Sequence, residues 1–293
     1  MSSKFKKIWD NNLKNRNLPD KCAGTIKIHY SDLNNLCYEF DQVKADNLIK
    51  ELLNGKVLIV KEAYKKQEIL EIKEKIINFW KKNPSTYHEM IEGCPDFHRV
   101  ITPEVAKLYA VGAVRHTTYF FPWNNDPCGL NEKIYEKWRI CKYVAGLDYL
   151  EYENNTPKDG SIDRIQVVCY PPKYGGVENH TDTKSNSPLA ISCYLSKRGE
   201  DYSTGGFYCL DFDNNIIDIE PEIDSGDISL YCPTIIHGVR PIDSNKELNN
   251  YEWNSGIGRW WMGLFTNDSN LKSNRKTSKS LETYHSEKLI NVK

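Results

Sequence analysis

Residues 165–182 read IQVVCYPPKYGGVENHTD, and this stretch decides the fold. Its first six residues are a β-branched and aromatic run typical of a buried strand, and PPKYGG is a turn signal. The residues after the turn predict an extended segment that carries His180 and Asp182. Side chains at positions i and i+2 of an extended segment point to the same side, so these two side chains can reach one point in space.

Six similar runs follow between residues 188 and 266, namely PLAISCYL, GGFYCLDF, NIIDIE, DISLYC, IIHGVRPI and RWWMGLF. Seven short strands at this spacing, separated by Gly- and Asp-rich turns, are typical of a β-sandwich or jelly roll. Upstream, KVLIV at 56–60 predicts a strand. The apolar spacing of Ile69, Ile72, Ile76 and Phe79 predicts an amphipathic helix, which ends before Pro84.

The chain is therefore expected to be mainly β with some α, with a β-sandwich or jelly-roll core and flanking N-terminal helices. Residues 1–40 are polar and predict an N-terminal extension with one short strand at 25–30. Residues 41–266 predict a single domain, in which 85–150 form a cap with a helix at 131–146 and 162–266 form the jelly-roll core. Residues 267–293 predict a polar C-terminal tail.

Composition excludes several classes of function. The 293 residues carry 39 basic and 40 acidic side chains, a net charge of −1, which argues against nucleic-acid or membrane binding by bulk electrostatics. Neither a membrane-spanning apolar run nor a secretory signal is recognisable. The nine cysteines form no CxxC motif and are odd in number, which favours reduced, buried thiols in a cytoplasmic protein.

A second histidine completes a candidate metal site. His237 lies in the predicted strand IIHGVRPI, and with His180 and Asp182 it supplies two imidazoles and one carboxylate. This donor set is the facial triad that leaves open positions on Fe(II). His-x-Asp alone is a weak motif, and a loop histidine at 180 or a hydrogen-bonded core histidine at 237 is the ordinary alternative.

The surroundings of these residues resemble the Fe(II)/2-oxoglutarate-dependent oxygenases, in particular their prolyl-hydroxylase-like and phytanoyl-CoA-hydroxylase-like branch. The similarity covers about residues 50–82 and 163–266. Its elements are Tyr170 ten residues before His180, Tyr194 in ISCYLS, Gly205-Gly206 before FYCLDF, SGDISLYCP before His237, and Arg259 at the start of RWWMGLF.

The resemblance implies a double-stranded β-helix (jelly-roll) core with flanking N-terminal helices. It also implies an enzyme that hydroxylates an unactivated C–H bond of a small molecule while 2-oxoglutarate is converted to succinate and CO₂. Its cofactors would be Fe(II), the co-substrate 2-oxoglutarate, O₂ and, as an optional reductant, ascorbate. His180, Asp182 and His237 would hold the iron and form the catalytic centre. Arg259, Tyr194 and Tyr170 would bind 2-oxoglutarate. The carboxylate at Asp182 argues against the related halogenases, whereas desaturation, epoxidation and cyclisation stay open.

One departure from the family concerns the arginine. Arg259 lies twenty-two residues after His237, about twice the usual spacing, which indicates a loop insertion. Arg240 is the rival, but strand alternation points it away from His237. The candidate substrate contacts are Lys184, Arg99, Arg115 and Trp123.

Two other functions stay open at this point. One is a non-catalytic jelly-roll module of the carbohydrate-binding type, which would expose its aromatic residues on a sheet face. The other is a cupin-type metalloenzyme that does not use 2-oxoglutarate. The sequence names neither the substrate nor the oligomeric state, and it gives no sign of a nucleic-acid or membrane partner.

Overall fold

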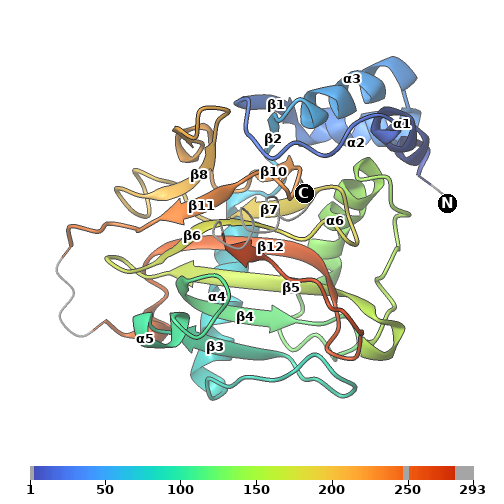
Figure 1. Cartoon of the computed structure of the whole chain (residues 1–293). Helices are drawn as coiled ribbons and strands as arrows, with labels where there is room; N and C mark the ends of the chain where they lie inside the picture. The colour runs from blue at the N-terminus through green and yellow to red at the C-terminus, as the bar shows by residue number, and fades with distance from the viewer. Residues whose placement is uncertain (1–2, 247–250, 281–293) are drawn as a thin grey trace.

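The computed structural model describes residues 3–246 and 251–280, which fold around two facing β-sheets (Figure 1). The strands are β1 (Thr25–His29), β2 (Val57–Lys61), β3 (Phe97–Ile101), β4 (Ala113–Phe120), β5 (Ser161–Tyr170), β6 (Gly176–Thr181), β7 (Ala190–Tyr194), β8 (Gly206–Leu210), β9 (Ile216–Asp218), β10 (Ile228–Tyr231), β11 (His237–Arg240), β12 (Arg259–Asp268) and β13 (Lys279–Ser280). The α-helices are α1 (Lys4–Leu13), α2 (Tyr30–Glu39), α3 (Gln42–Leu53), α4 (Lys66–Lys82), α5 (Pro103–Ala106) and α6 (Asn131–Val144). Three 3₁₀ turns lie at Pro157–Asp159, Glu220–Glu222 and Trp253–Ser255.

The larger sheet has the strand order β1-β2-β10-β7-β12-β5-β4-β3. The smaller sheet has the order β6-β11-β8-β9, and β13 pairs with the end of β6 on the side away from β11. β4 joins the two sheets, because its first residues pair with β6 and its later residues pair with β5. From β5 to β12 the chain alternates between the two sheets, except at the hairpin of β8 and β9, whose strands both lie in the smaller sheet. This is the strand arrangement of a double-stranded β-helix. The predicted jelly roll is thereby confirmed.

In strand β5, apolar and polar residues do not alternate strictly, because most of its residues are buried whichever face they point to. Ile165, Val167 and Cys169 belong to the main hydrophobic cluster on the outer face of the larger sheet, whereas Val168 and Tyr170 face inward. A strand covered on both sides reads as a continuous apolar run.

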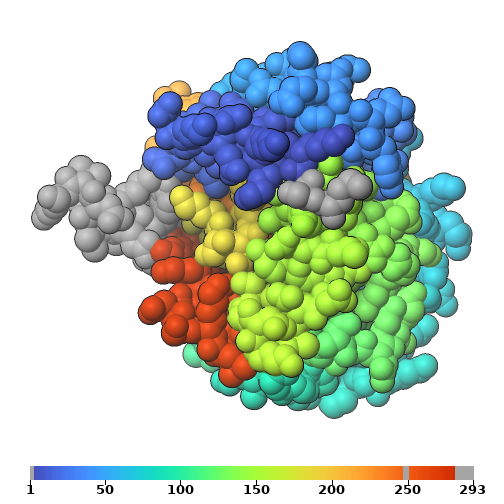
Figure 2. Space-filling model, turned by 90° about the vertical axis from the view of Figure 1, so that its right-hand side faces the viewer, coloured from blue at the N-terminus to red at the C-terminus, as the bar shows by residue number. Residues whose placement is uncertain are grey.

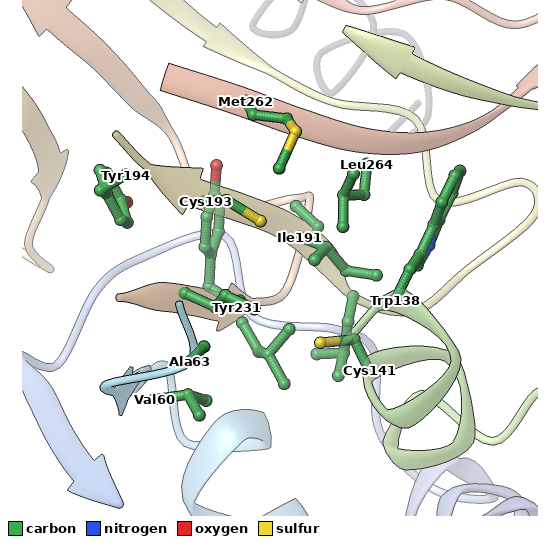
Figure 3. Close-up of a cluster of buried hydrophobic side chains, with 14 of the residues drawn as sticks. Val60, Ala63, Trp138, Cys141, Ile191, Cys193, Tyr194, Tyr231, Met262 and Leu264 are labelled. Atoms are coloured by element: carbon green, nitrogen blue, oxygen red, sulfur yellow. The ribbon is translucent and has the colours of Figure 1, made fainter. Parts of the chain in front are cut away.

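Helices α4 and α6 cover the outer face of the larger sheet. Figure 3 shows Trp138 and Cys141 of α6 beside Ile191 of β7 and Leu264 of β12. On α4, Ile69, Ile72, Ile76, Phe79 and Trp80 are buried, as their spacing predicts. Each such side chain contributes about 1.5–3 kcal/mol by leaving water.

Residues 3–40 pack against this body (Figure 2). Phe5, Ile8 and Trp9 of α1 are buried in the main cluster, and the Trp9 Nε1–H donates to the carbonyl of Val144 at the end of α6. β1 adds a parallel strand to β2. The predicted division into extension, domain, cap and tail stays a prediction.

Within residues 85–150, β3 and β4 extend the larger sheet next to β5. The nine cysteines are all free thiols, and only Cys128 is partly exposed. Within the described part of the chain, no helix is both long enough and apolar enough to cross a membrane.

Candidate metal centre and its cavity

The three predicted metal ligands meet where β6 and β11 pair. His180 stands directly opposite His237 in the antiparallel register, and their ring centroids are 4.2 Å apart. Asp182 follows β6 by one residue, and its carboxylate oxygens lie 3.8 Å from His180 Nε2 and 3.5 Å from His237 Nε2. One ligand atom from each residue lies within 4.8 Å of the others.

Backbone carbonyls fix which imidazole nitrogen faces the site. His180 Nδ1 lies 2.8 Å from the carbonyl oxygen of Glu178, and His237 Nδ1 lies 2.9 Å from that of Ile235. A carbonyl only accepts, so each Nδ1 carries the hydrogen and each Nε2 presents its lone pair. Two such nitrogens and a carboxylate fit a divalent transition metal such as Fe(II), with several coordination positions open.

The protonation states agree with this donor set. Burial, together with the nearby His237, lowers the pKa of His180 to about 4, so its imidazole is neutral at neutral pH. Burial alone would raise the pKa of Asp182, but the two histidines and the Ser278 hydroxyl hold it well below its usual range. Ser278 Oγ donates to Asp182 Oδ1 at 2.6 Å from the segment that leads into β13. His180 and Asp182 are therefore ready to bind a cation without releasing a proton.

A cavity of about 440 Å³ opens beside the three ligands, lined by residues of both sheets. Its walls include the aromatic side chains of Tyr119, Phe207, Tyr231, Trp261 and Phe265. A concave, largely apolar site with a few converging polar groups is the usual form of a small-molecule pocket.

Arg259 also lines this cavity and is 1% exposed. It begins β12, opposite Tyr170 of β5. Arg240, the rival in the sequence, is exposed at the end of β11, with its guanidinium 5.7 Å from the Tyr208 ring, and does not line the cavity. The structure therefore brings the first of these two arginines, and not the second, to the cavity of the triad.

A buried carboxylate occupies one edge of Arg259. Glu220 accepts from Arg259 Nε and Nη2, both at 2.8 Å, and also from the Tyr202 hydroxyl and the Phe207 backbone N–H. Although burial opposes ionisation of both groups, their attraction lowers the pKa of Glu220 and raises that of Arg259. Arg259 Nη1 is buried without an acceptor among the described residues.

Glu220 fits here because of a glycine. Gly206 has a φ of +117°, and a Cβ at this position would collide with the Glu220 side chain. A larger residue would push the carboxylate off Arg259, and that φ also disfavours L side chains.

The two tyrosines expected to accompany Arg259 differ in position. Tyr170 is buried and lines the cavity with its ring 5.6 Å from the Arg259 guanidinium. Tyr194 lies at the same distance from Arg259, but its hydroxyl is hydrogen-bonded to Ser229 Oγ at 2.8 Å and does not reach the cavity lining.

Two of the four predicted substrate contacts line the cavity and two do not. Arg99 and Arg115 line the cavity. Lys184 is exposed outside it, and Trp123 stacks on Phe121 and donates from Nε1 to the carbonyl of Cys94. Trp123 therefore belongs to a hydrophobic cluster beside β3 rather than to the cavity wall.

Sequence reasoning missed four residues of this site, namely Arg164, Glu220, Tyr231 and Ser278. Arg164 could have been found, because period-two alternation places it on the same face of its strand as Tyr170. Glu220 and Ser278 lie in a 3₁₀ turn and in the C-terminal segment, for which no periodic pattern exists.

Comparison with known proteins gives similarities to solved structures at low sequence identity. No protein-family profile and no curated protein matches it. Among solved structures, it is similar to a prolyl-4-hydroxylase from Pseudomonas putida, with a TM-score of 0.48 and 13% identity over 76% of this chain and 98% of that one. It is also similar to a Neurospora crassa protein in complex with alpha-KG and thymine, with a TM-score of 0.49 and 13% identity over 94% and 98%.

A third similar structure is a putative 2OG-Fe(II) oxygenase family protein from Caulobacter crescentus, with a TM-score of 0.45 and 13% identity over 92% of this chain and 99% of that one. At such identities the likeness concerns the fold. The jelly-roll topology and the His180–Asp182–His237 triad of this chain are those that its resemblance to the Fe(II)/2-oxoglutarate oxygenases led us to expect.

Proposed function

We propose that this protein is an Fe(II)- and 2-oxoglutarate-dependent dioxygenase that hydroxylates a C–H bond of a small molecule. The observation that carries the proposal is the triad at the wall of a cavity that also contains a buried arginine. When bound, Fe(II), 2-oxoglutarate and O₂ would supply the oxidation, and 2-oxoglutarate would leave as succinate and CO₂.

The residues of the chain have separate tasks in this reaction. His180 and His237 offer Nε2, and Asp182 offers a carboxylate oxygen, so the protein side of the metal is filled and the cavity side is open. Arg259 Nη1 is a buried donor with a free hydrogen for the distal carboxylate of 2-oxoglutarate. Tyr170 would lie beside that carboxylate, and the ring of Tyr194 would pack against the guanidinium.

One observation favours a second candidate, a metalloenzyme of the same fold that does not use 2-oxoglutarate. Glu220 already satisfies Arg259 Nε and Nη2, and the two charges cancel. The usual fork-shaped, bidentate recognition of a carboxylate is therefore available on only part of the guanidinium. Under this alternative, Arg259 and Glu220 would be a structural pair beneath the cavity.

An anaerobic titration with Fe(II) and 2-oxoglutarate separates the two candidates. A keto acid bound through two oxygens to facial-triad iron gives a weak visible charge-transfer band. We expect this band in the wild type, its loss in His237→Ala, and at least tenfold weaker 2-oxoglutarate binding in Arg259→Gln. Arg240→Gln, which removes an exposed charge outside the cavity, is the control and should match the wild type. Tight metal binding without the band would reject the use of 2-oxoglutarate.

A further inference from the structure

The cavity contains more positive charge than its own carboxylates neutralise. Of the cations in its wall, Arg259 is paired with Glu220 and Lys142 with Asp163. Four further arginines line it with no ion pair to any described residue, namely Arg99, Arg115, Arg164 and Arg275. Asp182, a metal ligand, is the single acidic side chain among the described lining residues.

Strand register places three of these arginines on one face of the larger sheet. Arg115 and Tyr119 share one face of β4, and Tyr119 stands opposite Gln166 of β5. Arg164 lies two residues from Gln166 and so on the same inward face. Arg99 of β3 pairs with Thr117 and joins that face as well. Arg275 reaches the cavity from the C-terminal segment that leads into β13.

Arg164 is the most constrained of the four. Its guanidinium lies 4.9 Å from the Tyr119 ring and 5.7 Å from the Phe265 ring, and Nη2 donates to Gln166 Oε1 at 3.0 Å. Burial, with contributions from the charges of Arg115 and Arg275, lowers its pKa to about 10, so it remains charged at neutral pH.

Two buried donors of this group lack acceptors. Arg164 Nε and Arg115 Nε are both buried with no hydrogen-bond partner among the described residues. A buried donor left without a partner costs roughly 1–3 kcal/mol, and a charged one costs more. An arrangement with two such donors and no counterion is suited to receive an anion.

The carboxylate that Arg259 is proposed to bind belongs to a different part of the cavity wall than Arg164. In the ladder between β5 and β12, Arg259 stands opposite Tyr170, whereas Arg164 stands opposite Phe265. Six residue steps separate the two backbone positions, about 20 Å along the strands.

Arg115 lies between these two parts of the wall in its contacts. Its neighbour His116 pairs with Cys169, so Arg115 lies beside Tyr170, and its charge also acts on Arg164. Arg164 is therefore the residue that distinguishes the proposed anion site from the co-substrate site.

We propose that Arg164 and Arg115 bind an oxyanion, a carboxylate or a phosphate, carried by the substrate on an aromatic or apolar body. Arg275 would close over the same group from the C-terminal segment. The body would lie against the rings of Tyr119, Trp261 and Phe265. That the bound anion is the substrate rests on the proposed function, but the anion site itself can be tested without metal.

The test measures binding of small aromatic probes to the metal-free protein by calorimetry. Benzoate and phenyl phosphate distinguish the two kinds of oxyanion, and benzamide is the neutral match. We expect at least one anion to bind at least tenfold more tightly than benzamide, and Arg164→Gln to lower its affinity at least tenfold. Arg16→Gln removes one exposed charge far along the sequence from the cavity strands and should leave the affinity unchanged.

Equal binding of benzamide and both anions, or equal anion binding by the wild type and Arg164→Gln, would overturn the proposal. A thermal melt of each variant shows that it is folded, and Arg164→Lys, which keeps the charge but not the planar fork, should fall between the wild type and Arg164→Gln.

The 2-oxoglutarate titration distinguishes this proposal from the proposed function. In Arg164→Gln the charge-transfer band should appear with a 2-oxoglutarate affinity within twofold of the wild type. If this variant lost the band as Arg259→Gln does, Arg164 would serve the co-substrate and the present proposal would fall. If the wild type gave no band but bound the anion through Arg164, the proposed function would fail and the anion site would stand.

Discussion

At the residue scale, Glu220 determines how much of the positive charge of Arg259 is available to a second carboxylate. The carboxylate and the guanidinium are 2% and 1% exposed and joined by two hydrogen bonds. Removing one partner from a buried pair leaves the other charge uncompensated, which typically costs about 3–5 kcal/mol. The same loss would free Arg259 to attract another carboxylate.

Glu220→Gln is therefore expected to have two opposite effects. The free energy of unfolding should fall by about 3 kcal/mol, measured by urea denaturation. The affinity for 2-oxoglutarate should rise severalfold, measured by the anaerobic titration, because the positive charge of Arg259 is no longer cancelled. Glu200→Gln, which removes a carboxylate from an exposed pair with Lys197, is the control for both measurements. An unchanged affinity in a destabilised Glu220→Gln would mean that Arg259 does not contact the co-substrate.

At the scale of elements, β3 and β4 are held to α4 by a pair of buried histidines. His98 Nδ1 lies 2.8 Å from His116 Nε2, and the two outer nitrogens face the carbonyl oxygens of Asn83 and Trp253. Trp80 of α4 stacks on His116 with ring centroids 3.7 Å apart. Satisfying all three contacts would take three hydrogens and hence a positive charge. Burial disfavours that charge, and it lowers the pKa of His116 to about 4 and that of His98 below its usual value.

This pair should make stability depend on pH. A histidine whose pKa is lower in the folded protein is protonated first in the unfolded chain, so acid favours unfolding. The contribution of His116 is complete above about pH 6.5 and is lost as the pH falls toward 4, by up to about 3 kcal/mol. Urea denaturation at several pH values across this range gives the free energy of unfolding as a function of pH. This free energy should fall less steeply with decreasing pH in His116→Gln than in the wild type. His29→Gln, at an exposed position in β1, should keep the wild-type slope. Identical slopes in all three proteins would contradict the assignment.

The elements also show which parts of the fold could be predicted from the sequence. Most of the strands from β5 to β12 were predictable because they are short β-branched and aromatic runs between turn signals. Helix α4 was predictable because its apolar residues are three and four positions apart. The metal triad was predictable because His180 and Asp182 are two residues apart on an extended segment. The contribution of β3 and β4 to the sheet was not predictable, because strand partners are determined by packing between distant segments. The role of Glu220 was not predictable for the same reason. It contacts Arg259, which lies 39 residues later in the chain, from a 3₁₀ turn.

At the scale of the whole molecule, the cysteines report on the integrity of the fold. Eight of the nine thiols are buried, and Cys128 alone is partly exposed. Burial raises the pKa of the Cys128 thiol to about 11, so even this group is a weak nucleophile near neutral pH.

Thiol counting should therefore separate the native protein from the unfolded chain. With a chromogenic disulfide reagent, we expect no more than one slowly reacting thiol in the folded protein and nine in urea. Cys128→Ser should remove the native reaction and leave eight in urea. Fast reaction of several thiols in the native protein would show that the two-sided packing of the larger sheet is looser than described.

The position of β13 has a practical consequence for preparing the protein. Lys279 and Ser280 pair with Thr181 and His180, and Ser278 is hydrogen-bonded to Asp182. The chain therefore passes over the proposed metal ligands only thirteen residues before residue 293. A polyhistidine tag fused after Lys293 would place additional imidazoles within a short tether of the site and compete for the same ion. A purification handle at the start of the chain, ahead of α1, avoids that competition in every metal-binding assay described above.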